Sequence, residues 1–224
     1  MEIYAINGSP RKNSNTATML KHFLEGAKSY SNTVETKLIN LYDYDYKGCH
    51  ECYLCKLKGG ASYGKCGYPD SIKELLEKVS YADGIVFGSP IFFHNISGEL
   101  RSFLERLFYP YAAYKRGGKR VIAPKQIFTA FIYTMNVTEK DMKEQDYLQN
   151  LTSTQNWAQH IFGYVPETIY TYYTYQYQDY DKYVADLWDI EEKKIWHNKQ
   201  FPLDCQNAFY SGKHMAEKIH VQNQ

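Results

Sequence analysis

Short apolar runs alternate along the chain with longer stretches in which apolar residues recur at helical spacing. The apolar run of residues 2–6 is followed by helical spacing over 14–30. Further strand patterns lie at 33–41, 84–88, 126–134 and 168–175, and further helical patterns at 70–80, 96–108, within 140–162 and at 204–219. Five strands that alternate with helices predict an α/β protein with a doubly wound, five-stranded parallel sheet, because right-handed crossovers place helices on both faces.

Two expectations concern single elements of this pattern. Residues 84–88 (GIVFG) are apolar at consecutive positions, which is typical of a strand covered on both faces. We expect Asp70 or Ser71 to cap the helix of residues 70–80, since both side chains offer an oxygen to the first free N–H groups.

The composition is that of an ordinary globular protein. Of the 224 residues, 44% are hydrophobic and 23% are charged, which argues against disorder and fibrous architectures. We expect one domain over 1–224, with a cysteine loop at 47–69 and a tyrosine-rich C-terminal extension at about 175–203.

The net charge of +1 argues against a nucleic-acid partner. No apolar run is long enough to span a membrane and the first residues lack the order of a signal peptide, so we expect a cytoplasmic protein without a membrane partner.

The loop after the first strand contains the parts of a phosphate site. In open parallel sheets, ligands bind beyond the carboxyl ends of the strands, where the strand order reverses. Here Ser9, Ser14 and Thr16 can donate hydrogen bonds, and Arg11 can form a fork to phosphate oxygens beside a helix N-terminus. The loop matches neither the G-x-G-x-x-G nor the Walker pattern. The alternative is an ordinary polar turn in which Ser14 caps the helix.

The loop after the third strand, GSPIFFHNISG at residues 88–98, combines an aromatic tip with amides and hydroxyls. Such a loop suits a flat heteroaromatic ring, which needs an apolar wall and polar partners along one edge. The alternative is that Phe92 and Phe93 are core or interface residues and that Asn95 caps the next helix. We interpret His94 as a structural hydrogen-bonding group. The loop after the fourth strand, residues 133–138, adds small polar groups at the same edge of the sheet.

These motifs together carry a family resemblance. GSPRKNSNT after strand one, GSPIFFHNISG after strand three and the cysteine loop resemble the flavodoxin-like NADPH-dependent FMN reductases, especially the branch that contains iron-sulfur flavoproteins. The resemblance implies a flavodoxin-like fold with FMN as cofactor and a first loop that binds the FMN phosphate. The implied phosphate-binding residues are Ser9, Arg11, Ser14, Asn15 and Thr16. The residues implied to border the flavin ring are Pro90, Ile91, Phe92, Phe93 and Asn95, together with Thr134, Met135 and Asn136.

The resemblance also implies a reaction. NAD(P)H would be the transient electron donor, and the acceptor would be a small molecule such as a quinone, a nitroaromatic, an azo compound or a flavin. The flavin supplies most of this chemistry, so no catalytic side chain is required. Members of this fold commonly form homodimers or higher homo-oligomers.

Four of the five cysteines lie close together in the sequence. Cys49, Cys52, Cys55 and Cys66 have the spacing C-x2-C-x2-C-x10-C, and clustered thiolates are ligands for iron-sulfur clusters or zinc. Iron-sulfur flavoproteins have a shorter gap before the fourth cysteine, so free thiols stay an alternative to either metal centre. Two other functions follow from this loop: electron relay between ferredoxin-like partners through FMN and a cluster, or thiol-based redox sensing.

Tyrosine is the other unusual feature: the chain has 23 tyrosines, and seven of them lie in the stretch from Tyr170 to Tyr183. Alternation in this stretch predicts a last strand packed against helices. Residues 177–201 could equally leave the domain and contact a second subunit near the flavin, because aromatic side chains at this density usually cover core or interface area.

Overall fold

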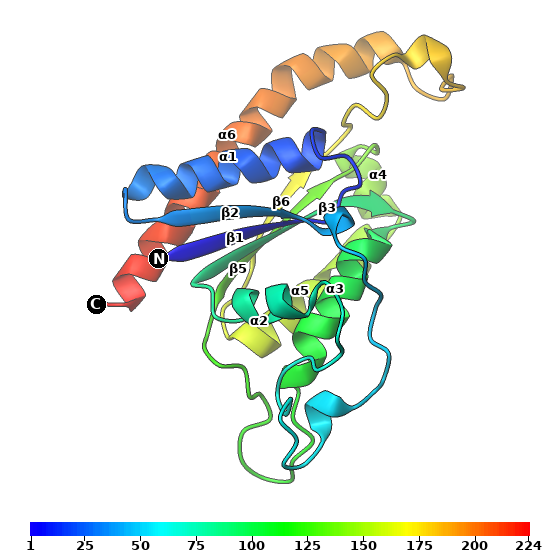
Figure 1. The fold of residues 1–224 in the computed structure, drawn as a ribbon. Helices are drawn as coiled ribbons and strands as arrows, with labels where there is room; N and C mark the ends of the chain where they lie inside the picture. Colours follow the sequence, from blue (N-terminus) through cyan, green and yellow to red (C-terminus); the bar gives the residue numbers. More distant parts are fainter.

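The computed structural model describes residues 1–224, and a parallel sheet lies at its centre (Figure 1). The strands are β1 (Glu2–Asn7), β2 (Glu35–Asn40), β3 (Gly84–Phe92), β5 (Phe128–Thr134) and β6 (Glu167–Thr171). They pair in the order β2-β1-β3-β5-β6, all parallel, while the two-residue strand β4 (Asn95–Ile96) pairs antiparallel with the end of β3. The predicted five-stranded doubly wound sheet is therefore confirmed, and its strand order reverses beside β1 and β3.

Helices cover both faces of the sheet. The helices are α1 (Asn15–Tyr30), α2 (Lys73–Val79), α3 (Gly98–Phe108), α4 (Glu139–Glu144), α5 (Tyr147–Phe162) and α6 (Ile190–Gln222). α1 and α6 pack on one face, and α2, α3 and α5 pack on the other. Alternate strand residues enter the two cores, with Ile85 and Phe87 on the α3 side and Val86 on the α1 side. None of the helices combines the length and apolar character needed to cross a membrane.

Two glycines bring α1 and α6 into backbone contact. A Cβ atom at Gly26 would lie 1.8 Å from the carbonyl oxygen of Phe209, and one at Gly212 would lie 1.8 Å from that of Phe23. Any side chain at either position would force the helices apart. The C-terminal half of α6 is thereby fixed on the sheet.

α6 begins at Ile190, so the predicted start at residue 204 is wrong. Pro202 lies inside the helix, whereas proline ordinarily ends one because it lacks an N–H donor. The true N-terminus is capped by Asp189, whose carboxylate accepts from the N–H of Glu192 at 2.9 Å. The part of α6 before Pro202 extends beyond the sheet (Figure 1), and much of the predicted irregular extension is therefore helical.

Two smaller predictions are also wrong. β6 ends at Thr171 rather than at residue 175, and Tyr173 adopts a left-handed backbone with φ +51°. Neither Asp70 nor Ser71 caps α2. Instead, Asp70 forms an ion pair with Arg106, and the hydroxyl of Ser71 donates to the carbonyl oxygen of Asp45 at 2.7 Å. Both side chains are thus used to hold the cysteine loop.

Candidate functional site

The loop after β1 is held in place by its own polar groups. The N–H of Ser9 donates to Asn7 Oδ1 at 3.0 Å, and the N–H of Arg11 donates to Ser9 Oγ at 3.2 Å. The N–H of Gly8 donates to the carbonyl oxygen of Gly88 at 2.8 Å, which joins the loop to the end of β3. The loop is therefore fixed at the point where the strand order reverses.

The start of α1 leaves hydrogen-bond donors free. Ser14 occupies the N-cap position, but its side chain makes no capping hydrogen bond, and no acidic residue lies in the first turn. The N–H groups at a helix start lack intrahelical partners, and the helix dipole favours an anion there. These groups fit a phosphate better than they fit the alternative of an ordinary capped helix.

A cavity of about 1120 Å³ lies beside this loop. One side is formed by Arg11, Asn13, Ser14 and Asn15, and Phe92 of β3 reaches the same space. The other side comes from the start of α6 and from residues 175–183, which we call the tyrosine segment. The predicted phosphate loop and one predicted ring residue thus meet at one cavity.

The tyrosine segment lies directly on the predicted phosphate loop. Arg11 Nη1 donates to the carbonyl oxygen of Gln176, and Asn15 Nδ2 donates to that of Tyr175 at 2.7 Å. Asn136 Nδ2 donates to Gln176 Oε1 at 3.1 Å. The segment therefore contacts the site of its own chain, and Tyr175 and Gln176 are site residues that the sequence reasoning missed.

The tip between β3 and β4 is a tight hairpin. Phe93 and His94 take the left-handed backbone with φ values of +48° and +63°, as both central residues of a type I′ turn must. Phe93 is 100% exposed, so it is not a core residue. His94 stacks on Tyr147 with ring centres 4.1 Å apart, which is a structural role.

Pro90 and Ile91 are half-buried at the end of β3. Asn95 does not cap α3: its Oδ1 accepts from the N–H of Ile96 at 2.9 Å, while Ser97 Oγ accepts from the N–H of Leu100. The alternative role of Asn95 as a helix cap is therefore wrong.

The end of β5 meets the first loop. The hydroxyls of Thr16 and Thr134 are hydrogen-bonded at 2.7 Å, and both residues are buried, as is Met135. Asn136 Oδ1 is buried without a hydrogen-bond partner. A buried acceptor without a partner is costly. Together with the free Ser14 hydroxyl, this acceptor fits a polar cofactor at the carboxyl edge of the sheet.

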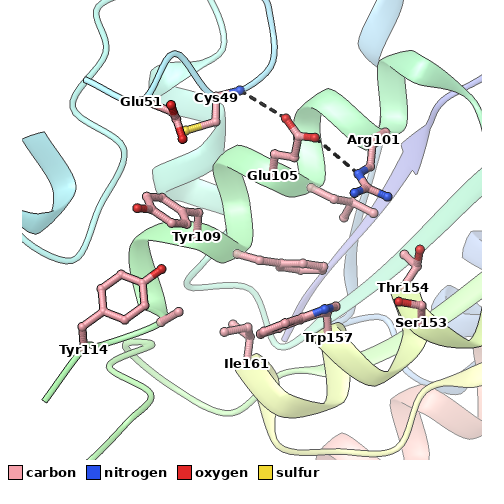
Figure 2. A pocket seen from close by; sticks show the side chains of 13 residues that line it. Cys49, Glu51, Arg101, Glu105, Tyr109, Tyr114, Ser153, Thr154, Trp157 and Ile161 are labelled. Carbon is pink, nitrogen blue, oxygen red and sulfur yellow. Dashed lines mark hydrogen bonds and ion pairs between the residues drawn. The ribbon is translucent and has the colours of Figure 1, made fainter. Parts of the chain in front are cut away.

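A second cavity, of about 570 Å³, lies between the cysteine loop, α3 and α5 (Figure 2). Its apolar lining includes Tyr109, Tyr114 and Trp157. Glu105 of α3 accepts from the backbone N–H of Cys49 and from Arg101 Nε, both at 3.3 Å. This second cavity borders the cysteine loop, and none of the predicted FMN residues lines it.

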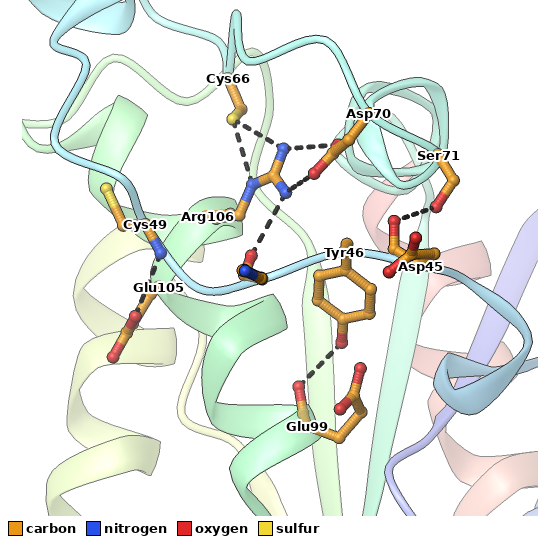
Figure 3. Close-up of polar contacts among 10 residues, drawn as sticks. Asp45, Tyr46, Cys49, Cys66, Asp70, Ser71, Glu99, Glu105 and Arg106 are labelled. Carbon is orange, nitrogen blue, oxygen red and sulfur yellow. Dashed lines mark hydrogen bonds and ion pairs between the residues drawn. The ribbon is translucent and has the colours of Figure 1, made fainter.

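The cysteine loop is fixed to α3 by a buried arginine (Figure 3). Arg106 is 2% exposed and forms an ion pair with Asp70. Its Nε and Nη2 donate to Cys66 Sγ at 3.4 Å each, and Nη1 donates to the carbonyl oxygen of Lys47. One guanidinium therefore ties both ends of the loop to the domain.

All four loop cysteines line one small cavity of about 20 Å³. Cys49 and Cys52 are exposed, Cys66 is half-buried and Cys55 is buried, which raises the pKa of the Cys55 thiol. Four sulfur donors suit an iron-sulfur cluster or zinc chemically. In this structure, however, no three His, Cys, Asp or Glu side chains are arranged to hold a metal ion. The metal site stays a prediction.

Comparison with known proteins identifies the family. Residues 1–165 match the family described as NADPH-dependent FMN reductase. The chain belongs to this family. Membership confirms the predicted class of FMN-dependent oxidoreductases and FMN as the cofactor.

Curated relatives of this chain are named iron-sulfur flavoproteins. One from Methanocaldococcus jannaschii is 34% identical over 106 residues, which cover 47% of this chain and 51% of the relative. One from Archaeoglobus fulgidus is 37% identical over 124 residues, which cover 55% and 57% respectively. The chain thus spans about half the length of the curated relatives it matches.

Solved structures share the fold at low sequence identity. An NAD(P)H:quinone oxidoreductase from Methanothermobacter marburgensis has a TM-score of 0.65 at 16% identity, covering 96% of each chain. An FMN-dependent NADH-azoreductase from Bacillus anthracis, solved in complex with FMN, has a TM-score of 0.61 at 17% identity, covering 97% of this chain and 98% of that one. These similarities confirm the flavodoxin-like fold.

The C-terminal part of the chain lies outside the family match and adds two basic side chains with buried nitrogen atoms. Lys193 is 0% exposed, and its Nζ donates to the carbonyl oxygen of Asn136 at 3.3 Å. His197, one turn later, lines the larger cavity and has a buried Nδ1 without a partner. Neither was predicted, because the sequence pattern placed both residues in an irregular segment.

Proposed function

We propose that the chain is an NAD(P)H oxidoreductase that uses bound FMN to reduce a small acceptor such as a quinone, a nitroaromatic, an azo compound or a flavin. The observation that carries the proposal is the cavity that joins the free donors at the α1 N-terminus to aromatic side chains at the same sheet edge. Arg11, Ser14 and Asn15 would hold the FMN phosphate, and the bound cofactor would supply the capacity to accept a hydride and to donate electrons.

The side chains of the site have separate tasks. Arg11, Ser14 and Asn15 bind the phosphate, and Arg11 and Asn15 also donate to backbone carbonyl oxygens of the tyrosine segment. Phe92 and Tyr175 offer flat apolar surface to a ring and exclude water. This division supports a protein that binds and orients a flavin.

FMN binding tests the proposal directly. The affinity of the apoprotein for FMN is measured by flavin fluorescence for the wild type, Arg11→Ala and the control Lys12→Ala. Lys12 is a neighbouring loop cation, but it pairs with Asp43 and does not line the cavity. We expect Arg11→Ala to weaken binding by about tenfold or more and Lys12→Ala to change it little.

Equal FMN affinity in all three proteins would overturn the placement of the phosphate. Oxidation of NADPH or NADH by the FMN-loaded wild type, followed with a benzoquinone as acceptor, tests the reaction itself. Failure of both nicotinamides to reduce the bound flavin would overturn the proposed activity.

A second candidate is electron relay through FMN and an iron-sulfur cluster. It is favoured by the convergence of Cys49, Cys52, Cys55 and Cys66 on one cavity and by the names of the curated relatives. Anaerobically purified protein would then contain iron and acid-labile sulfide and absorb near 400 nm beyond the flavin bands. Cys52→Ser should lose this absorption, whereas Cys205→Ser, a buried cysteine outside the loop, should keep it. Wild-type protein without iron or sulfide would exclude the relay.

We also propose a homodimer. Phe93 projects fully into solvent beside half-exposed Phe92, and adjacent exposed aromatic side chains are typical of an interface. Light scattering should give a dimer for the wild type and a smaller species for Phe93→Ser, and a monomeric wild type would contradict the proposal.

A further inference from the structure

The C-terminal part of the chain holds the loop that follows β5. We call residues 135–137 the β5 loop. The N–H of Thr174 donates to the carbonyl oxygen of Met135 at 3.0 Å. The N–H of Tyr173 donates to the carbonyl oxygen of Val137 at 2.9 Å. Both donors follow β6 and lie outside the family match, so the position of the β5 loop is set by a part of the chain that the match does not cover.

Lys193 of α6 binds the third carbonyl group of this loop. Its Nζ donates to the carbonyl oxygen of Asn136 at 3.3 Å. In a trans peptide, as all peptides of this chain are, the carbonyl group of one residue and the N–H group of the next point in opposite directions. The N–H groups of Asn136 and Val137 therefore point away from the groups that hold the loop, and neither has a backbone partner. The β5 loop is thus anchored by its carbonyl groups and keeps two donors free of the backbone.

The ammonium group of Lys193 is buried without a counter-charge. Lys193 is 0% exposed and takes part in none of the ion pairs of the structure. The ring centres of Tyr173 and Trp188 lie 3.8 and 5.8 Å from its nitrogen, and aromatic faces offset only part of the cost of burying a cation. Burial lowers the pKa of Lys193 to about 8, so at pH 7 most molecules still carry the charge. A negative charge nearby would therefore stabilise this part of the protein.

Two further polar atoms near Lys193 lack partners. Asn136 Oδ1 is buried without a hydrogen bond, while Nδ2 of the same side chain donates to Gln176. Nδ1 of His197, one helical turn after Lys193, is also buried without a partner. Burial and the charge of Lys193 lower the pKa of His197, so this ring is neutral at pH 7 and adds no second charge. Gln176 and His197 both line the cavity of about 1120 Å³, which places Lys193 at the margin of the proposed cofactor site.

The proposed reaction adds negative charge to that site. A hydride consists of two electrons and one proton, so its transfer from NAD(P)H adds one negative charge to the bound cofactor and releases the oxidised nicotinamide. Charges inside a protein attract one another over about 10 Å, because little water or salt screens them. A fixed cation at the margin of the cavity therefore stabilises the reduced cofactor more than the oxidised one.

We propose that Lys193 is a positioning residue for the flavin, which holds Asn136 beside the ring and raises the reduction potential of bound FMN with its positive charge. The inference rests on the proposed function and deepens it, since it names the group that adjusts how readily the cofactor accepts a hydride. An apolar side chain could fill the same space without the cost of a buried charge. The charge at position 193 is thus accounted for by its action on the cofactor.

The test measures the midpoint potential of bound FMN. FMN-loaded protein is reduced slowly and anaerobically together with a dye of known potential, and the absorbances of flavin and dye are compared at equilibrium. Lys193→Met removes both the charge and the hydrogen bond, whereas Lys193→Gln removes the charge and keeps a donor. Lys199→Met is the control, because Lys199 is an exposed cation of α6 that neither forms an ion pair nor lines the cavity.

In both Lys193 variants we expect the affinity for reduced FMN, relative to that for oxidised FMN, to fall by about tenfold or more. Each tenfold change lowers the midpoint potential of a two-electron couple by about 30 mV. Lys199→Met should keep the wild-type potential, and Lys193→Gln should bind oxidised FMN about as tightly as the wild type does. For a variant that retains FMN weakly, titration of the apoprotein with oxidised and with reduced FMN gives the same ratio of affinities.

Three results would overturn the inference. Equal potentials in the wild type and both Lys193 variants would show that the charge does not act on the flavin. A lower potential in Lys193→Met alone would reduce the role of Lys193 to its hydrogen bond, and equal weakening of both oxidation states would make that role purely structural. All three leave the proposed function standing if NAD(P)H reduces the bound flavin. Wild-type protein that binds no FMN, or whose FMN neither nicotinamide reduces, would instead contradict the proposed function.

Discussion

The ammonium group of Lys193 lies 3.3 Å from the carbonyl oxygen of Asn136 and 3.8 Å from the centre of the Tyr173 ring. No carboxylate pairs with it, although the side chain is fully buried. A buried ammonium without a counter-charge destabilises the fold, and burial lowers the pKa of Lys193 from 10.5 to about 8. The enzyme therefore maintains an unfavourable charge next to the loop that is predicted to border the flavin.

Lys193→Met should change how stability depends on pH. Because the pKa of Lys193 is lower in the folded state than in the unfolded state, unfolding takes up a proton between about pH 8 and 10.5. The wild type should therefore gain stability as pH rises through this window, by on the order of 2 to 3 kcal/mol over the full window. The methionine variant should lack this gain, which urea denaturation at pH 7, 8 and 9 would measure.

The control for this prediction is Lys194→Met, because Lys194 is exposed at the next position. Burial also raises the pKa of Tyr109, to about 12, so tyrosine ionisation affects stability mainly above about pH 10 and lies outside the measured range. Identical slopes for Lys193→Met and the wild type would show that the buried ammonium does not titrate in this window.

The hydroxyl pair of Thr16 and Thr134 should be energetically coupled. Thr16→Val keeps the shape of the side chain but leaves the buried Thr134 hydroxyl without its 2.7 Å partner. We expect a loss of about 1 to 2 kcal/mol. The double variant Thr16→Val with Thr134→Val should lose less than the sum of the two single losses, as a double-mutant cycle measures. If the two single losses simply add, the hydrogen bond between the two hydroxyls contributes nothing to stability.

Asp70→Asn should destabilise the protein far more than an exposed charge change does. It leaves the guanidinium of Arg106 buried without a counter-charge, which typically costs about 3 kcal/mol or more. Glu77→Gln is the matched control, since its pair with Lys65 is solvent-exposed and contributes at most about 1 kcal/mol. Similar unfolding free energies for the two variants would contradict the anchoring role of Arg106.

The sheet was predictable because buried parallel strands and amphipathic helices have distinct periods. The consecutive apolar residues of GIVFG mark β3 in the sequence. Successive side chains of this strand enter the two cores in turn, because helices cover both faces of the sheet. Capping was not predictable, since Asp70 and Ser71 are both good caps that tertiary partners on other segments recruit instead.

The site was predictable only where contacts are local. Ser9, Arg11 and Ser14 follow from a turn before a helix; in the structure Ser9 Oγ accepts from the N–H of Arg11, and Arg11 and Ser14 line the larger cavity. The contact of Tyr175 with Asn15 joins segments 160 residues apart and leaves no signal in either segment alone. The tyrosine cluster was visible in the sequence, but its composition fits a subunit interface as well as a wall of the chain's own cavity.

Pro202→Ala should stabilise the protein. Pro202 lies inside α6 and is exposed, so it deprives the helix of one hydrogen bond while contributing little packing. We expect a gain of about 1 to 3 kcal/mol by urea denaturation, with slower hydrogen exchange before residue 202 and no such change for the exposed control Gln206→Ala. A lower stability would mean that proline at this position is required for packing. His197 lies before Pro202 and lines the larger cavity. A stabilised variant with weaker FMN binding would therefore indicate that the proline sets the position of the cavity wall at the expense of helix stability.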